Sequence, residues 1–124
     1  LRQRLEVFLA SRNQSGKILP ITPDASTREY FRIFWNEIPA IACVYPFNEL
    51  CFGQFEACLD VTDVFLSAGL PVARIYASDE EKQIIIQEDF GDTLLRDRLR
   101  ESGAAQKAKL IDEAIKLIVR IQAA

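Results

Sequence analysis

A strictly alternating segment constrains the fold of this chain more than any other feature of its sequence. Over residues 29–35, Phe31, Ile33 and Trp35 fall on one side, and the side chains between them fall on the other. A period of two residues is typical of a β-strand with two different faces. A turn and a second apolar stretch at 40–45 follow at once, which predicts an antiparallel hairpin. The chain is therefore expected to form a sheet through local pairing of strands.

The other elements follow from apolar spacing and from the positions of Gly and Pro. Helical spacing predicts a first helix ending near 15–16, and a long helix that starts after Asn48 and stops at Gly69 and Pro71. Further strands are expected at 18–22, 72–77 and 83–87, and further helices at 93–101 and 104–124. Most strands follow one another without an intervening helix, which excludes a parallel doubly wound sheet. The expected fold class is α+β, with a five-stranded, mainly antiparallel sheet.

The last expected helix carries a broad apolar stripe. Its buried side is predicted to consist of Leu110, Ile111, Ala114, Leu117, Ile118 and Ile121. A stripe of this width needs another layer to cover it. The helix then packs back on the sheet, pairs with a second copy, or begins a second lobe that this chain lacks, and we favour the last of these. The chain also starts at Leu1 and contains no Met, so we expect it to be a piece of a longer protein.

Composition excludes several kinds of function. The 124 residues contain no His, which excludes Ser-His-Asp and Cys-His relays and imidazole metal ligands. The net charge of -3 and the lack of a basic patch argue against a nucleic-acid partner. Cys43, Cys51 and Cys58 form no CxxC pair, so we expect reduced core thiols in a cytoplasmic protein, not a zinc site. No apolar run is long enough to span a bilayer, so no membrane partner is expected.

Three segments resemble, in order, the motifs of one family of bacterial enzymes. Residues 24–32 (DASTREYFR) resemble a D-A-S-x-R-x-Y-F-R signature, and residues 68–77 (AGLPVARIYA) resemble an AGLPVPRIYA passage. Residues 84–93 (IIIQEDFGDT) resemble an LLLLEDFGDxT strand and hinge. In addition to these three, the shorter stretch 117–122 resembles the LLxLQ end of the first helix of the large lobe. The chain is thus similar to the aminoglycoside phosphotransferase and choline kinase-like superfamily. Within it, the nearest subgroup phosphorylates the amino sugars N-acetylmuramate or N-acetylglucosamine of the bacterial cell wall.

This resemblance implies a fold and a division of the chain. It implies the small lobe of the protein-kinase-like fold over residues 1–87, a hinge at 88–92, and the first helices of a truncated C-terminal lobe at 93–124. ATP is then the nucleotide, and a sugar or amino sugar hydroxyl is the acceptor. The catalytic residues and the Mg²⁺ ligands are expected in the missing C-terminal lobe, so this chain alone is expected to be inactive.

The resemblance also implies where the phosphates of the nucleotide lie. It places a phosphate-covering turn at Asp24–Arg28, between the first two strands, where backbone N–H groups face phosphate oxygens. Ser26 and Thr27 add hydroxyl donors there, and Arg28 is the nearest cation. Taken without the rest of the motif, the same residues indicate an ordinary polar hairpin turn.

The hinge is implied to hold the adenine ring. The carbonyl of Glu88 would accept from the adenine amino group, the N–H of Phe90 would donate to a ring nitrogen, and Gln87 would be the gatekeeper. Asp89 lies within the same segment, and an apolar slot is expected from Ile33, Ala42 and Ile86. A structural alternative is that the segment caps the next helix, with Asp92 as N-cap.

One expected residue is missing from the third strand. A protein kinase carries its phosphate-pairing Lys there, but residues 40–46 (AIACVYP) contain none. Arg28, Arg32 or Mg²⁺ must then neutralise the phosphates. This departure motivates an alternative function, a non-catalytic interaction or regulatory domain with a kinase-like fold. A third possibility is a self-contained homo-oligomer that uses the last helix as its interface.

Overall fold

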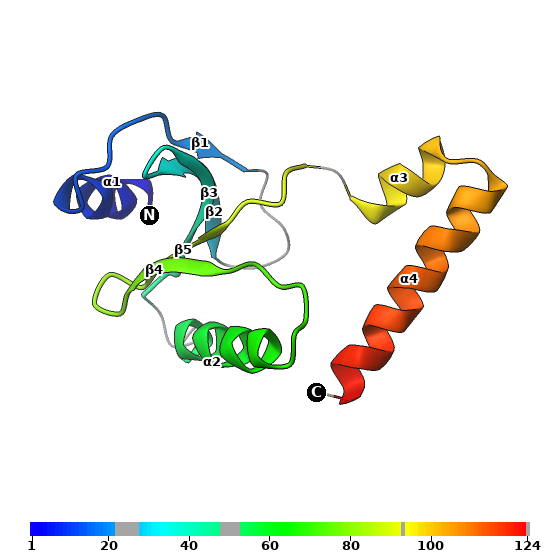
Figure 1. Ribbon diagram of the computed structural model, residues 1–124. Helices are drawn as coiled ribbons and strands as arrows, with labels where there is room; N and C mark the ends of the chain where they lie inside the picture. The colour runs from blue at the N-terminus through cyan, green and yellow to red at the C-terminus, as the bar shows by residue number, and fades with distance from the viewer. Residues whose placement is uncertain (22–27, 48–52, 93, 124) are drawn as a thin grey trace. The chain divides into compact units, whose positions relative to one another are not determined.

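The computed structural model describes residues 1–21, 28–47, 53–92 and 94–123. The chain forms two compact units (Figure 1). Unit 1 comprises Leu1–Thr62 and Ala73–Asp89, and contains the sheet. Unit 2 comprises Asp63–Val72 and Phe90–Ala124, and is helical. The fold class is α+β, as predicted.

The five-stranded antiparallel sheet that the sequence predicts is present. Its strands are β1 (Leu19–Pro20), β2 (Glu29–Trp35), β3 (Ile38–Val44), β4 (Ile75–Asp79) and β5 (Ile84–Glu88). The order across the sheet is β1-β2-β3-β5-β4, and all neighbours pair antiparallel. The triple-isoleucine strand β5 lies inside the sheet, and its three isoleucines are fully buried. A continuous apolar run is typical of a strand covered on both faces.

Two strands differ from the bounds that the sequence predicts. β1 is shorter than the expected 18–22, although the N–H of Ile21 still bonds the carbonyl of Tyr30; residue 22 lies outside the described residues. β4 begins three residues later than the expected start at 72. The N–H of Val72 donates to the carbonyl of Leu70, so the backbone at residue 72 is not extended as the prediction required, although Arg74 already bonds Glu88 of β5. The bounds of β4 are instead set by its pairing with β5.

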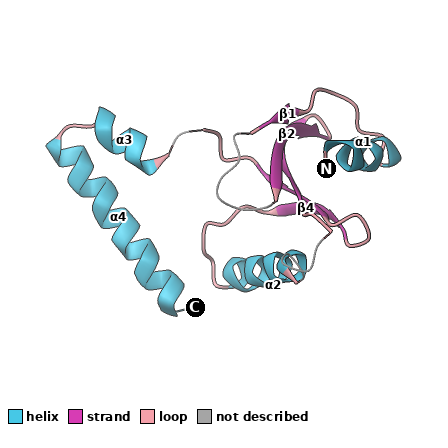
Figure 2. Ribbon diagram, turned by 180° about the vertical axis from the view of Figure 1, so that it is seen from behind, coloured by secondary structure: helices cyan, strands magenta, loops and turns pink. Residues whose placement is uncertain are grey.

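Two helices cover the two faces of the sheet in unit 1 (Figures 1 and 2). The first, α1 (Arg2–Ser11), buries Leu5, Phe8 and Leu9 against one face, and the Phe8 ring stacks on Trp35 at 6.0 Å. The second, α2 (Gln54–Ser67), buries Phe55 on the opposite face. The expected N-cap of α2, Asn48, lies outside the described residues.

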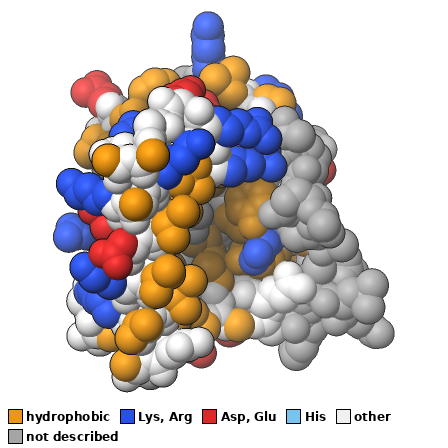
Figure 3. Space-filling view, turned by 90° about the vertical axis from the view of Figure 1, so that its right-hand side faces the viewer, with side chains coloured by type: hydrophobic (Ala, Val, Ile, Leu, Met, Phe, Trp, Pro, Cys, Tyr) orange, Lys and Arg blue, Asp and Glu red, His pale blue; other side chains and the backbone are white. Residues whose placement is uncertain are grey.

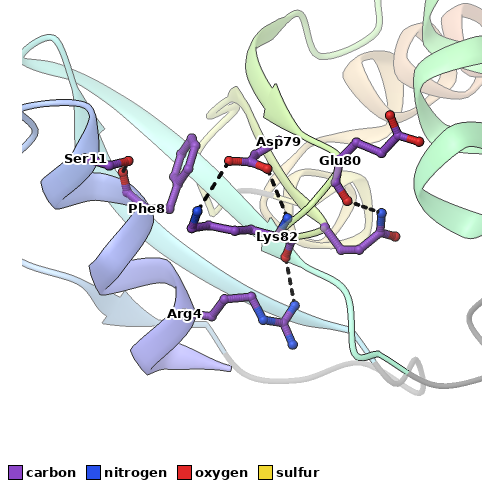
Figure 4. Close-up of polar contacts among 7 residues, drawn as sticks. Arg4, Phe8, Ser11, Asp79, Glu80 and Lys82 are labelled. Atoms are coloured by element: carbon purple, nitrogen blue, oxygen red, sulfur yellow. Dashed lines mark hydrogen bonds and ion pairs between the residues drawn. The ribbon is translucent and has the colours of Figure 1, made fainter.

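Polar contacts of Arg4 fix α1 to the far end of the sheet (Figure 4). Its guanidinium donates to the carbonyls of Tyr45, at 2.6 Å, and Lys82, at 2.9 Å. Lys82 closes the β4–β5 turn, where its N–H donates to the carboxylate of Asp79 at 3.0 Å. A guanidinium shared by two carbonyls therefore holds a helix, a strand end and a turn together.

Unit 2 contains the C-terminal end of α2 together with α3 (Leu95–Glu101) and α4 (Ala104–Ala123). The stop predicted at Gly69 is confirmed: Gly69 has a φ of +74°, and the N–H of Leu70 reaches back to Phe65. Arg120 of α4 donates to the Gly69 carbonyl at 2.7 Å. The prediction of Asp92 as N-cap is wrong, because α3 begins later, with Leu94 at the N-cap and no side-chain cap bond.

The burial predicted for α4 is wrong for half of its stripe. No α4 side chain in the described residues is fully buried. Leu110, Ala114 and Leu117 are half-buried, whereas Ile111, Ile118 and Ile121 are exposed. Figure 3 shows hydrophobic side chains gathered in a long stripe on the face that it presents. No helix of the described residues is both long and apolar enough to cross a membrane.

Candidate functional site

The two faces of the sheet carry two separate groups of buried side chains. The α1 face includes Phe31, Ile33, Ala40, Ala42, Val44, Ile84 and Ile86. The α2 face includes Tyr30, Cys43, Tyr45, Ile75 and Ile85. Successive residues of a strand point to opposite faces, so β2, β3 and β5 each contribute to both groups in turn. This division decides which side chains can meet a ligand.

The three residues expected to form an apolar adenine slot all lie on the α1 face. Ala42 and Ile86 are fully buried, and Ile33 is nearly so. They are Cα neighbours or near neighbours across β2, β3 and β5, and they pack beneath α1. The structure therefore brings these residues together, but in the hydrophobic core and not at a surface that a ligand can reach.

The α2 face is only half covered by its helix. One row across the sheet, Tyr30–Cys43–Ile85, packs with α2. The next row, Arg32–Ile41–Gln87, is half-buried, and beyond it Phe34 is 50% exposed. We call Arg32, Phe34, Ile41 and Gln87 the open half-face. It offers apolar side chains flanked by a guanidinium and an amide, at the end of the sheet where β5 leaves the ladder.

Arg32 and Asp89 form a two-pronged ion pair at the edge of the open half-face. The guanidinium Nε lies 2.7 Å from Asp89 Oδ2, and Nη2 lies 3.2 Å from Oδ1. The Asp89 side chain is 7% exposed and that of Arg32 is 27% exposed. A guanidinium and a carboxylate that meet through two parallel bonds fix both orientation and distance. The pair joins two of the sequence motifs, since Arg32 ends the first and Asp89 lies in the third.

The other expected hinge residues differ in how they are held. Glu88 is the last residue of β5; its N–H donates to the carbonyl of Arg74 at 2.8 Å, and its carboxylate accepts from the Arg74 N–H at 3.1 Å. Gln87 is half-buried on the open half-face. Phe90 is 66% exposed. The end of β5 is therefore fixed from two sides, by Arg74 and by Arg32.

Arg28 lies at the start of β2 and reaches into the α2 face. Its guanidinium donates to the Tyr45 hydroxyl at 3.3 Å, and lies 5.6 to 5.7 Å from the ring centroids of Tyr45 and Tyr30. The other residues expected to contact phosphate, Asp24, Ser26 and Thr27, lie outside the described residues. Arg28 is thus placed beside the third strand, and the row of Tyr30 and Cys43 separates it from the open half-face.

Cys43 stands on the α2 face of the strand that lacks a Lys. Burial raises the pKa of its thiol to about 11, although hydrogen bonding with Tyr45 and the charge of Arg28 partly oppose this shift. A thiol of this pKa is protonated at neutral pH and is a poor nucleophile. Burial raises the pKa of Tyr45 as well. The cluster is therefore a packed, uncharged support for the Arg28 guanidinium.

Sequence reasoning missed Ile41 and the Arg32–Asp89 pairing. Ile41 lies in a strand that is apolar on both faces, so its sequence gives no sign of which face α1 covers. The sequence did contain a signal for the ion pair. Arg32 and Asp89 carry opposite charges and belong to two different motifs, and in an antiparallel sheet their strands can lie with only one strand between them. The register of β2, β3 and β5, which places Arg32 in one row with Ile41 and Gln87, could not be predicted from the sequence.

A hollow of ≈ 680 Å³ adjoins the open half-face at Phe34. It is lined by Asn13, Gln14, Ser15, Phe34, Asn36 and Glu37. The Gln14 amide donates to Asn36 Oδ1 at 2.8 Å and accepts from the Asn36 N–H at 2.9 Å. This double contact holds the β2–β3 turn against the segment after α1. The hollow is therefore bounded by a braced turn.

The search for metal-binding groups and the comparisons with known proteins add no further information on the function. Among the described residues, no three His, Cys, Asp or Glu side chains gather in a way that could hold a metal ion. No protein-family model matches the chain, and no match was found among curated proteins.

Proposed function

We propose that this chain is the nucleotide-binding lobe of an ATP-dependent phosphotransferase whose acceptor is the hydroxyl of a sugar or amino sugar. The fold in this proposal is the small lobe of the protein-kinase-like fold. The strand order β1-β2-β3-β5-β4, with one helix between β3 and β4, is consistent with such a lobe. The three motifs that resemble the phosphotransferase family support the same assignment.

The observation that carries the proposal is the open half-face beside the end of β5. A planar heterocycle needs a flat, partly apolar surface for its ring and backbone groups for its edge. Ile41 and Phe34 supply apolar contact, Gln87 lies opposite Ile41 on β5, and Glu88 follows it at the end of the strand. In this proposal Ile41 takes the place that the sequence assigned to Ala42.

The phosphates would lie toward the other end of β2. The charge of Arg28 acts on the thiol of Cys43. Cys43 faces α2 on the strand where a kinase-like lobe carries Lys. A guanidinium can bind phosphate oxygens through two bonds at once. In this proposal Arg28 replaces the missing Lys, and Tyr45 orients its side chain. Mg²⁺ would neutralise further phosphate charge, and its ligands are proposed to belong to the C-terminal lobe of the enzyme.

The alternative function is a non-catalytic interaction or regulatory domain. It is favoured by one observation, that β3 presents an uncharged, buried thiol to α2 in place of a cation. The two functions differ in nucleotide binding. A domain that has lost the chemistry has no need of ATP–Mg²⁺, whereas the proposed lobe binds it.

The proposal is tested by filling the open half-face with a larger side chain. We expect Ile41→Trp to abolish the heat of ATP–Mg²⁺ binding in calorimetry, because the indole occupies the space of the base. Ile38→Trp is the matched control, since Ile38 lies in the same strand, is exposed, and points to the opposite face. Equal binding by both variants would contradict the placement of the base. Absence of binding by the unmodified chain at millimolar ATP–Mg²⁺ would favour the regulatory domain.

A further inference from the structure

The Arg32–Asp89 ion pair has a role that neither the phosphate chemistry nor the core explains. Both residues belong to motif segments, yet neither lies in the α1 core or in the cluster under α2. We propose that the pair is a positioning device, which holds the end of β5, residues 87–89, in the geometry that a base edge requires. This inference rests on the proposed function. It assigns a positioning role to Arg32 and Asp89, which do not themselves contact the phosphates.

The first step is that the sheet ceases to hold the chain at Asp89. The ladder between β3 and β5 ends at the pair Ala40 and Glu88. Asp89 follows directly, and its side chain accepts two bonds from Arg32. The bonds from Arg32 at 2.7 and 3.2 Å provide a fixed attachment to β2, one strand beyond β3. The carbonyl and amide groups on either side of Asp89 are thereby oriented relative to the open half-face.

The second step is that Arg32 is committed to this contact. Two of its five N–H donors bond one carboxylate that is almost fully buried. The positive charge is then balanced locally, which makes Arg32 a poor partner for a triphosphate. Arg28 lies four residues away in an extended strand, about 13 Å along it. The two arginines therefore serve opposite ends of the proposed site, Arg28 the phosphates and Arg32 the base.

The third step is that the two ends can be probed with separate ligands. Adenosine carries the base without phosphates, and inorganic tripolyphosphate carries the phosphates without a base. The double variant Arg32→Gln/Asp89→Asn removes both charges and leaves the net charge of the chain unchanged. A general electrostatic change in tripolyphosphate binding is therefore avoided. Binding is followed by titration of the 124-residue chain with each ligand.

We expect the double variant to bind adenosine roughly tenfold more weakly, since the end of β5 loses one of its two attachments and keeps only that to Arg74. Its affinity for tripolyphosphate should stay the same. Arg28→Gln should show the mirror image, with weaker tripolyphosphate binding and unchanged adenosine binding. Arg32→Lys, which keeps the charge and one bond, should recover part of the adenosine affinity. A merely structural role would lower both affinities together with the urea midpoint.

Matched controls separate local positioning from loss of fold. Asp79→Asn removes a carboxylate that bonds Lys82 at the other end of β4 and β5, and should leave both affinities unchanged. If the double variant binds adenosine as well as the unmodified chain, or if it loses tripolyphosphate affinity, the positioning role is overturned alone. If the unmodified chain binds neither adenosine nor ATP, the proposed function fails with it.

Discussion

The side chain of Cys43 is a titratable group in an environment very different from water. It is buried between the sheet and α2, in contact with a cluster that includes Tyr30, Tyr45, Cys58 and the Arg28 guanidinium. Burial raises its pKa from 9.0 to about 11. The folded chain therefore holds this proton more tightly than the unfolded chain does. The resulting contribution to the free energy of unfolding is present below about pH 9 and is lost as pH rises toward 11.

We expect the free energy of unfolding to fall by about 2 kcal/mol more in the unmodified chain than in Cys43→Ala between pH 8 and pH 11. Burial is the largest cause of the raised pKa of Tyr45 and is present in both proteins, so the difference between them reports mainly on the Cys43 thiol. Urea denaturation under reducing conditions measures the difference. Equal pH slopes in the two proteins would show that the Cys43 thiol is not held in its protonated form by the fold.

At the scale of elements, the β2–β3 hairpin has one unfavourable residue in its turn. Asn36 and Glu37 connect the paired residues Trp35 and Ile38, and they have φ values of +48° and +67°. A two-residue turn with both φ angles positive favours Asn at its first position and Gly at its second. Asn36 fits this pattern. Glu37 does not, because a side chain in the left-handed region is strained.

We expect Glu37→Gly to stabilise the chain by about 0.5–1 kcal/mol, as the removal of strain exceeds the added chain entropy. Thermal or urea unfolding measures the change. Glu37→Ala is the control, because it removes the carboxylate but keeps a β-carbon at positive φ. If both variants were equally stabilised, the cause would be the lost charge and not the backbone conformation.

The hairpin and the interior strand β5 were predictable because their signals are local. Alternation over seven residues fixed β2 at 29–35, and three adjacent isoleucines indicated a strand covered on both sides. The start of β4 was not predictable in this way. Val72 is apolar and β-prone, but its N–H bonds the carbonyl of Leu70, and only the pairing of Ile75 with Gln87 shows where the strand starts.

The candidate site was predictable in part, for a related reason. Motif positions pointed to Gln87, Glu88 and Asp89, which do lie together at the end of β5. The apolar residues of the slot could not be assigned, since β3 is apolar on both faces and two amphipathic helices compete to cover them. Only the assembled sheet shows that α1 takes the face of Ala42 and leaves that of Ile41 half open.

For unit 1 as a whole, we propose that the nucleotide binds on the α2 face of the sheet and not on the α1 face. Isoleucine methyl groups report on this directly, because Ile41 lies on one face and Ile33 and Ile86 lie on the other. The measurement is an NMR experiment on chain with labelled isoleucine methyls, in the presence of millimolar ATP–Mg²⁺. We expect nuclear Overhauser effects from the base protons of adenine to the Ile41 methyl, and none to Ile33 or Ile86. Contacts from the base to Ile33 or Ile86, or methyl signals unchanged by ATP–Mg²⁺, would contradict the proposed function.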